Sequence, residues 1–257
     1  TSGTATANVF PAVIEASLSE VPLLVLTADR PHRLRGADAN QTIDQVRLYG
    51  TYVREFIDVP PPVTDGPALQ HLRTVAVRSV ATSLTAPFGP VHINFPFDKP
   101  LEPVDPDPEF VTAHPIAASG RTDGNPFVEM SVGRSELTEQ ELDRLASALA
   151  AKRGVIVAGA ESEPEKVGKA ALSLSAATGY PILADPLSGA RFGPSEGADR
   201  VAAYDLFLRD EGICRALNPD LVLRVGATPT SAALQAWLQH HNGVRHIVVD
   251  AGQRWKD

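Results

Sequence analysis

The stretch Pro22-Leu23-Leu24-Val25-Leu26-Thr27 is a short, continuous apolar run, and a long polar loop follows it. Such a run is typical of a strand that is buried on both faces of a parallel sheet. The loop reads Ala28-Asp29-Arg30-Pro31-His32-Arg33-Leu34-Arg35-Gly36-Ala37-Asp38-Ala39-Asn40-Gln41-Thr42-Ile43-Asp44-Gln45. Ligands of open α/β sheets bind beyond the carboxyl ends of such strands, and long loops in compact domains are usually functional or disordered. This loop is therefore the first candidate site.

Five side chains make the loop suitable for an anionic ligand. Arg30 comes directly after the apolar run, where a guanidinium can bind a carboxylate through two donors. Asn40 and Gln41 can donate to anionic oxygens and accept from hydroxyls. Arg33 and Arg35 are candidates by proximity alone. We therefore predict a ligand with several carboxylates; the alternative is a loop whose arginines form salt bridges.

Working outward, helical and strand patterns alternate through the first hundred residues. Val9, Val13 and Ala16 favour a helix over residues 5–19, with a kink or a later start because of Pro11. Asp65 is a suitable N-cap for a helix that reaches about residue 85. The other predicted elements are a short helix at 42–50 and strands at 53–59 and 90–95. Alternation of this kind implies a parallel sheet.

Residues 99–135 lose this periodicity and gather Pro, Asp, Gly and Ser, which indicates a linker between two domains. Thr138 and Glu141 then form a capping box at the start of a second α/β unit. Its predicted strands are 155–158, 182–184, 221–225 and 246–250, and its predicted helices include 204–217, one that ends at Gly179 and one that starts near 230 and stops at Asn242-Gly243. We therefore expect an α/β protein whose second unit is Rossmann-like.

Composition limits the classes of function. The 257 residues carry a net charge of −8, which disfavours a broad nucleic-acid surface. No apolar run is long enough for a membrane span, and no secretory signal is recognisable. The single cysteine, Cys214, excludes a disulfide within the chain and fits a reducing cytoplasm. Cys214 is expected to be a buried structural residue.

Several further residues are weak candidates. Gly159 and Gly226 follow strands but lie in no dinucleotide motif, so we interpret them as strand-to-helix turns. His92 lies on an apolar strand and is interpreted as a satisfied core residue. Three histidines are close in sequence, His240, His241 and His246. Because they have no nearby cysteine and no obvious acidic partner, we expect surface residues rather than a metal site.

Four segments share their order and spacing with a known family. They are Thr1-Ser2-Gly3-Thr4-Ala5 with Asn8, Leu26-Thr27-Ala28-Asp29-Arg30-Pro31, Ala39-Asn40-Gln41-Thr42, and Val91-His92-Ile93-Asn94-Phe95-Pro96-Phe97. Together they closely resemble the 2-succinyl-5-enolpyruvyl-6-hydroxy-3-cyclohexene-1-carboxylate synthases, thiamine-diphosphate enzymes of menaquinone biosynthesis. The resemblance is specific over residues 1–100 and weaker but consistent in the second unit.

The resemblance implies a domain plan. Residues 1–100 would be the C-terminal part of a pyrimidine-binding domain with a parallel sheet, and 101–135 the linker. Residues 136–257 would be the Rossmann-like central domain of the thiamine-diphosphate enzyme fold, of the transhydrogenase dIII type, incomplete at its C-terminal end. The parent enzyme would be a cytoplasmic homodimer or homotetramer, with active sites between subunits and neither a nucleic-acid partner nor a membrane span.

The resemblance also implies a reaction and roles for residues. In this family thiamine diphosphate decarboxylates 2-oxoglutarate, and the carbanion-like product adds to isochorismate, so the enzyme is a transferase and a carboligase. Arg30, Asn40 and Gln41 would face the substrates. The Ser2, Gly3 and Thr4 turn would lie near the cofactor.

The chain also departs from the family pattern. The glutamate that activates the cofactor lies before the Thr-Ser-Gly turn, and the segment that holds magnesium and the diphosphate lies far downstream; neither is found in residues 1–257. We therefore expect an inactive internal part of a longer enzyme, without catalytic or metal-binding residues of its own. The alternatives are another thiamine-diphosphate 2-oxo-acid decarboxylase, such as an acetohydroxyacid-synthase-like enzyme, or a non-catalytic regulatory module that binds anions.

Overall fold

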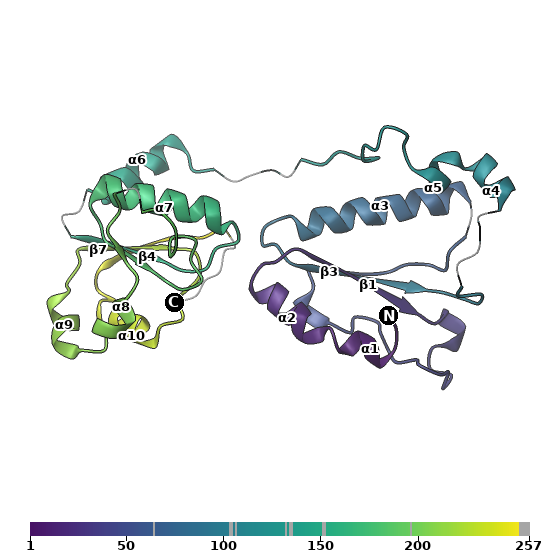
Figure 1. The fold of residues 1–257 in the computed structure, drawn as a ribbon, viewed down its shortest axis with the longest axis horizontal. Coiled ribbons are helices and arrows are strands. Elements are labelled where there is room, and N and C mark those ends of the chain that lie inside the picture. The colour runs from purple at the N-terminus through teal and green to yellow at the C-terminus, as the bar shows by residue number, and fades with distance from the viewer. Residues whose placement is uncertain are drawn as a thin grey trace. The chain divides into compact units, whose positions relative to one another are not determined.

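The computed structural model describes residues 1–63, 65–102, 105, 107–131, 133, 136–150, 153–195 and 197–251. The chain divides into two compact units, Thr1–Gly133 and Arg134–Asp257. Each unit contains its own sheet, and every strand pair in both sheets is parallel (Figure 1). The predicted parallel α/β fold class is confirmed.

The sheet of the first unit has the strand order β1-β3-β2. Its strands are β1 (Leu23–Asp29), β2 (Glu55–Asp58) and β3 (Pro90–Pro96). Helix α3 (Gly66–Ser83) packs Val75 on Val91 and Ile93 on one face of the sheet, and α2 (Phe10–Leu18) lies on the other (Figure 1). Asp65 caps α3 as predicted, since its side chain accepts a hydrogen bond from the Ala68 N–H.

Strand β1 is not buried on both faces, so that prediction is wrong for this strand. Leu24 and Leu26 are 41% and 57% exposed, and β1 is at the edge of the described sheet. The central strand β3 is the one with both faces buried. A continuous apolar run does not by itself distinguish a central strand from an edge strand.

Two helices of the first unit differ from their predicted bounds. The helix expected over 5–19 is divided into α1 (Thr4–Ala7) and α2, with Pro11 in the first turn of α2, where its missing N–H costs nothing. The helix expected over 42–50 is absent: the segment forms turns, and only Gly50–Tyr52 forms a short 3₁₀-helix. Arg47 and Gly50 have φ of 54° and 55°, which interrupts a right-handed helix.

The parallel register places polar side chains in a row across the first sheet. Thr27 on β1 and Asp58 on β2 are both paired with Asn94 on β3. Residues paired in this way point to the same face of a sheet. The row lies near the carboxyl ends of its three strands, which is where ligands of α/β sheets bind.

The predicted linker contains structure of its own. Two short helices, α4 (Pro108–Ala113) and α5 (Pro115–Ser119), lie within it, and the Asp107 side chain caps α4. Each begins with a proline, which is favourable in the first turn of a helix. Helices this short show little periodicity in their sequence. The short lengths and the prolines explain why the sequence pattern indicated no helix there.

The second unit has the strand order β6-β5-β4-β7-β8. Its strands are β4 (Gly154–Ala158), β5 (Ile182–Ala184), β6 (Arg200–Val201), β7 (Leu221–Val225) and β8 (Arg245–Val249). Numbered along the chain these strands run 3-2-1-4-5, the order of a Rossmann-like sheet, as predicted. Strand β6 was not predicted, since a pair of residues has no detectable alternation.

The helices of the second unit are α6 (Glu139–Ala148), α7 (Pro164–Thr178), α8 (Tyr204–Phe207), α9 (Glu211–Ala216) and α10 (Ala232–His240). The predicted capping box of Thr138 and Glu141 is present, and Gly179 ends α7 with a φ of 71°. The single helix predicted at 204–217 is two helices. Cys214 on α9 is only partly buried and packs beside the apolar cluster of this unit.

None of the described helices is both long and apolar enough to cross a membrane.

Candidate functional site

The centre of the polar row is Asn94, whose side chain is fully buried. Its Nδ2 donates to Asp29 Oδ2 at 2.9 Å and to Asp58 Oδ1 at 3.0 Å. Its Oδ1 accepts from Thr27 Oγ1 at 2.7 Å and from Gln45 Nε2 at 2.9 Å. Since carboxylates only accept, the amide has one orientation that satisfies all four contacts. Asn94 therefore joins the three strands to the candidate loop.

His92 is fully buried beside this network. Its Nε2 lies 2.8 Å from Thr27 Oγ1, and the Thr27 hydroxyl hydrogen is directed to Asn94, so Nε2 carries the proton. Within the described residues Nδ1 has no hydrogen-bond partner. Burial lowers the pKa of His92 to about 4, so the ring is neutral near pH 7. The prediction that His92 is a buried core residue is thus confirmed, but the prediction that its polar atoms are all hydrogen-bonded is wrong for Nδ1.

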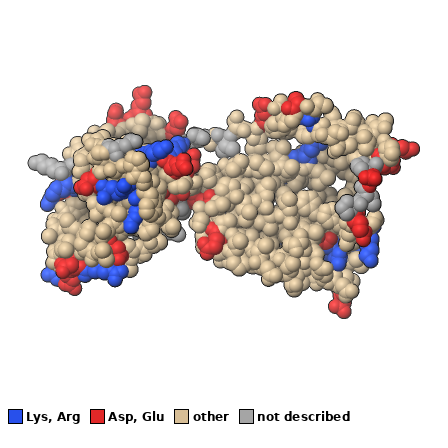
Figure 2. All heavy atoms as spheres, in the orientation of Figure 1, with Lys and Arg blue, Asp and Glu red and all other residues tan. Residues whose placement is uncertain are grey.

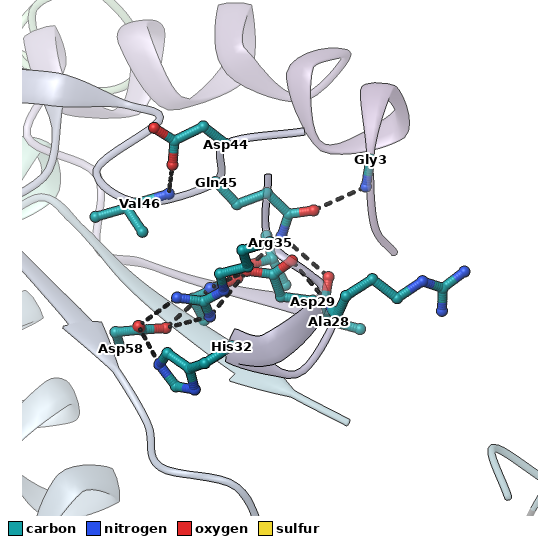
Figure 3. Close-up of polar contacts among 12 residues, drawn as sticks. Gly3, Ala28, Asp29, His32, Arg35, Asp44, Gln45, Val46 and Asp58 are labelled. Carbon is teal, nitrogen blue, oxygen red and sulfur yellow. Dashed lines mark hydrogen bonds and ion pairs between the residues drawn. The ribbon is translucent and has the colours of Figure 1, made fainter. Parts of the chain in front are cut away.

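Arg35 is a structural ion-pair partner of two buried or half-buried carboxylates (Figure 3). Its Nη1 lies 2.8 Å from Asp58 Oδ2, and its Nη2 lies 2.9 Å from Asp29 Oδ2. The hydrogen bonds to Asp58 raise the pKa of Arg35 above its usual value. Burial would raise the pKa of Asp58, but hydrogen bonds from Arg35 and Asn94 outweigh it and leave that pKa below its usual value.

Arg33 is also paired, because its Nη2 lies 2.5 Å from Asp98 Oδ2 at the surface. The alternative interpretation, a salt-bridged loop, therefore describes Arg33 and Arg35. Arg30 differs from both: in the part of the chain that the structure describes, its guanidinium has no carboxylate partner. Its Nε and Nη2 donate instead to the Asn40 carbonyl at 3.4 and 3.2 Å.

The structure brings five of the predicted site residues together, and we call Ser2, Gly3, Arg30, Asn40 and Gln41 the Arg30 cluster. Gln41 Nε2 donates to Ser2 Oγ at 3.0 Å, and Arg30 is joined to Asn40 as described. A Cβ on Gly3 would lie 2.8 Å from the Gln41 carbonyl oxygen, so only glycine fits there.

The sixth predicted residue, Thr4, is exposed at the start of α1 and is not part of the Arg30 cluster.

A pocket opens beside the Arg30 cluster. Its volume is about 350 Å³, and Ser2, Ala28, Asp29, Arg30, Phe97, Pro100 and Leu101 line it. The pocket lies beyond the end of β1 and carries one cation without a carboxylate partner among the described residues. On the face shown in Figure 2, Lys and Arg lie among Asp and Glu and form no continuous basic surface. A small anion bound near Arg30 would therefore be recognised locally.

Gln45 connects the Arg30 cluster to the buried network. It is 1% exposed, and its Oε1 accepts from the Gly3 N–H at 2.8 Å (Figure 3). Its Nε2 donates to the Ala28 carbonyl at 3.0 Å as well as to Asn94. Asp29 provides a second connection, since its Oδ1 accepts from the Arg30 N–H at 2.7 Å.

Sequence reasoning missed five members of this network: Thr27, Asp29, Gln45, Asp58 and Asn94. Thr27, Asp58 and Asn94 were visible as polar residues in or directly after predicted strands. If the strand order β1-β3-β2 had been known, the sequence would have shown that these three residues lie in one row. Gln45 carried no such signal because it lies in a segment that the pattern assigned to a helix.

The resemblance implies thiamine diphosphate and magnesium, and the described residues do not fit the metal-binding part of that site. Among them, no group of three or more His, Cys, Asp and Glu side chains could hold a metal ion. The prediction that the three clustered histidines are surface residues is wrong for His241, which is buried and has its Nδ1 2.9 Å from the Trp237 carbonyl oxygen. We therefore derive no step through the cofactor from the described residues.

Gly159 and Gly226 bring two loops of the second unit into direct contact. A Cβ on Gly159 would lie 1.8 Å from the Ala227 carbonyl oxygen, and one on Gly226 would lie 2.5 Å from the Ala160 carbonyl oxygen. The Ala227 N–H donates to the Ala160 carbonyl at 2.8 Å. These glycines follow neighbouring strands, β4 and β7, and permit this close approach at the point where the strand order reverses.

Comparison with known proteins agrees with the fold of the second unit. Residues 121–256 match the family model described as "Middle domain of thiamine pyrophosphate". Over its whole length the chain is 47% identical to a protein of Halobacterium salinarum, 44% identical to one of Chloroflexus aurantiacus and 39% identical to one of Listeria innocua. All three are named 2-succinyl-5-enolpyruvyl-6-hydroxy-3-cyclohexene-1-carboxylate synthase.

The chain covers 44%, 42% and 43% of the lengths of these relatives, so it spans less than half of each. The family model matches more than half of the chain, and the matched residues contain the whole described Rossmann-like sheet. The chain therefore belongs to the family of thiamine pyrophosphate enzyme middle domains.

Proposed function

We propose that this chain is part of a 2-succinyl-5-enolpyruvyl-6-hydroxy-3-cyclohexene-1-carboxylate synthase, a transferase of menaquinone biosynthesis that uses 2-oxoglutarate and isochorismate. The observation that carries the proposal is 39–47% identity along the entire chain to relatives with that name. Thiamine diphosphate with magnesium would supply the decarboxylation and carbon–carbon bond formation. Because the chain spans less than half of the relatives, the activity belongs to the longer parent protein.

The Arg30 cluster is the part of the substrate site that this chain would supply. Both proposed substrates are dicarboxylates, and a guanidinium can bind a carboxylate through two parallel hydrogen bonds. Arg30 is suited to this role because its side chain donates only to a neutral carbonyl among the described residues. Gln41, adjacent to it through Asn40, adds an amide that can donate to the same anion.

The backbone that carries Arg30 is fixed before any ligand binds. The Arg30 N–H donates to Asp29, which is itself held by Asn94 and Arg35. A preorganised donor costs less to bring into contact with an anion than a donor on a mobile loop. The chain would thus bind and orient one acid group of a substrate, while the reacting atoms lie elsewhere.

The test is a substrate panel on the full-length parent protein with thiamine diphosphate and magnesium. The proposal predicts decarboxylation of 2-oxoglutarate in preference to pyruvate, and product formation only when isochorismate is added. Preference for pyruvate would instead indicate an acetohydroxyacid-synthase-like enzyme. Tight binding of anionic metabolites without any turnover would indicate a regulatory module.

A further inference from the structure

Gln45 is buried, yet it makes more connections than any side chain of the Arg30 cluster itself. Its amide bonds to Gly3 at the start of the chain, to Ala28 after β1 and to Asn94 on β3. These three partners belong to segments that are far apart in sequence. With 1% of its surface exposed, Gln45 cannot itself contact a ligand in the pocket.

The direction of each hydrogen bond follows from the chemistry of its partners. The Gly3 N–H can only donate, and the Ala28 carbonyl can only accept, so Oε1 must face Gly3 and the amide nitrogen must face Ala28. The Asn94 Oδ1 is fixed in the same way by the two carboxylates on its amide nitrogen. Gln45 therefore has a single orientation that pairs all of these groups.

Two routes lead from this network to the Arg30 cluster. Through Gly3 it holds the turn that carries Ser2, which accepts from Gln41, and the Gly3 backbone itself packs against Gln41. Through Asn94 and Asp29 it holds the backbone of Arg30. The cationic and the carboxamide parts of the cluster are thereby held relative to the same buried point.

We propose that Gln45 is a positioning residue of the Arg30 cluster, which fixes the turn at Gly3 and with it the separation between Gln41 and Arg30. The proposal rests on the proposed function only for the identity of the ligand. If Gln45 had a purely structural role, replacing it would weaken ligand binding no more than a substitution at a neighbouring buried contact that costs the same stability. A positioning role predicts a larger loss of ligand binding.

The structure offers a matched control in Tyr49. Its hydroxyl donates to the Thr6 carbonyl at 2.9 Å in the core, and so it joins the same loop to the same N-terminal segment through Thr6 rather than through Gly3. Tyr49→Phe and Gln45→Met each remove buried hydrogen bonds of this junction and retain most of the side-chain volume. They separate stability of the junction from positioning of the cluster.

The experiment measures KM and kcat for 2-oxoglutarate, together with the melting temperature, in the full-length protein. We expect Gln45→Met to raise KM by about tenfold or more, because small misplacements of binding groups are costly. Tyr49→Phe should lower the melting temperature with KM within about twofold of the wild type. Equal KM in the two variants, at comparable melting temperatures, would overturn the proposal.

A second measurement on the unmodified protein does not depend on how the variants fold. The Gly3 amide should exchange slowly with deuterium, because it is buried in a hydrogen bond to Gln45, and 2-oxoglutarate should slow exchange of residues 40–45 further. Fast exchange at Gly3 in the folded protein would contradict the proposal. If the Gly3 amide exchanges slowly in the wild-type protein but 2-oxoglutarate changes no exchange rate, the proposed function is contradicted and the positioning role is not.

Discussion

At the scale of single residues, the first unit is organised around polar groups that are buried and paired. Asn94, Thr27 and Gln45 satisfy one another, and Asp29 and Asp58 are both paired with Arg35. Burial of such groups is costly unless they are paired, so the network specifies one arrangement of strands and loop. His92 is the exception, since one of its ring nitrogens has no partner among the described residues.

His92 gives the first unit a pH-dependent stability. Its pKa is about 4 when folded and near 6.5 when unfolded, so the unfolded state binds more protons between these values. Stability is unaffected above pH 6.5 and falls as the pH drops from 6.5 towards 4, by about 3 kcal/mol in total. Denaturant unfolding at pH 7 and pH 4.5 measures the effect.

His92→Phe should remove this part of the pH dependence, because phenylalanine does not titrate. The exposed His71 on α3 provides the control, and His71→Ala should keep the wild-type slope. If the His92→Phe protein loses stability on acidification as steeply as the wild type, other groups cause the loss.

At the scale of helices and strands, local signals explain which elements the sequence predicts. Helix α3 and strand β3 are found because Asp65 caps the one and Pro96 ends the other. The segment 42–50 is predicted as a helix, but the positive φ of Arg47 and Gly50 interrupts a right-handed helix there, and Gln45 and Tyr49 form hydrogen bonds to the N-terminal segment instead. The polar row could not be predicted because it depends on strand order, which no local pattern encodes.

Two glycines in the second unit should differ in how much stability an alanine substitution costs. Gly179 has a positive φ with open space around its Cβ position, whereas a Cβ on Gly159 would meet the Ala227 carbonyl oxygen at 1.8 Å. Gly179→Ala should therefore cost only about 1 kcal/mol, the penalty of the left-handed backbone. Gly159→Ala should cost about 3 kcal/mol or more, because backbone must move. Urea unfolding of both variants measures the two losses of unfolding free energy. Similar losses in the two variants would contradict the close packing at Gly159.

At the scale of the whole molecule, we propose that the chain supplies part of the substrate site of a longer protein. Relatives named as synthases are more than twice its length. The resemblance read from Arg30, Asn40 and Gln41 agrees with the names of those relatives, and the structure adds the buried network behind these residues. The domain roles assigned to residues 1–100, 101–135 and 136–257 remain a proposal.

The isolated chain should not release CO₂ from 2-oxoglutarate, even with thiamine diphosphate, magnesium and isochorismate. The reason is that its described residues contain no cluster of three or more His, Cys, Asp and Glu side chains that could hold the metal ion. A coupled assay for CO₂ on the purified chain, with the full-length protein as the positive control, measures this. Turnover by the chain alone would show that it contains a complete site.

The most direct test of the central claim compares Arg30→Ala with Arg33→Ala in the full-length protein. The Arg30 guanidinium has no carboxylate partner among the described residues, whereas the Arg33 guanidinium is already paired with Asp98 at the surface. If Arg30 binds a substrate carboxylate, Arg30→Ala should raise KM for 2-oxoglutarate about tenfold or more with little change in melting temperature, and Arg33→Ala should change neither quantity. Unchanged kinetics in Arg30→Ala would contradict the account.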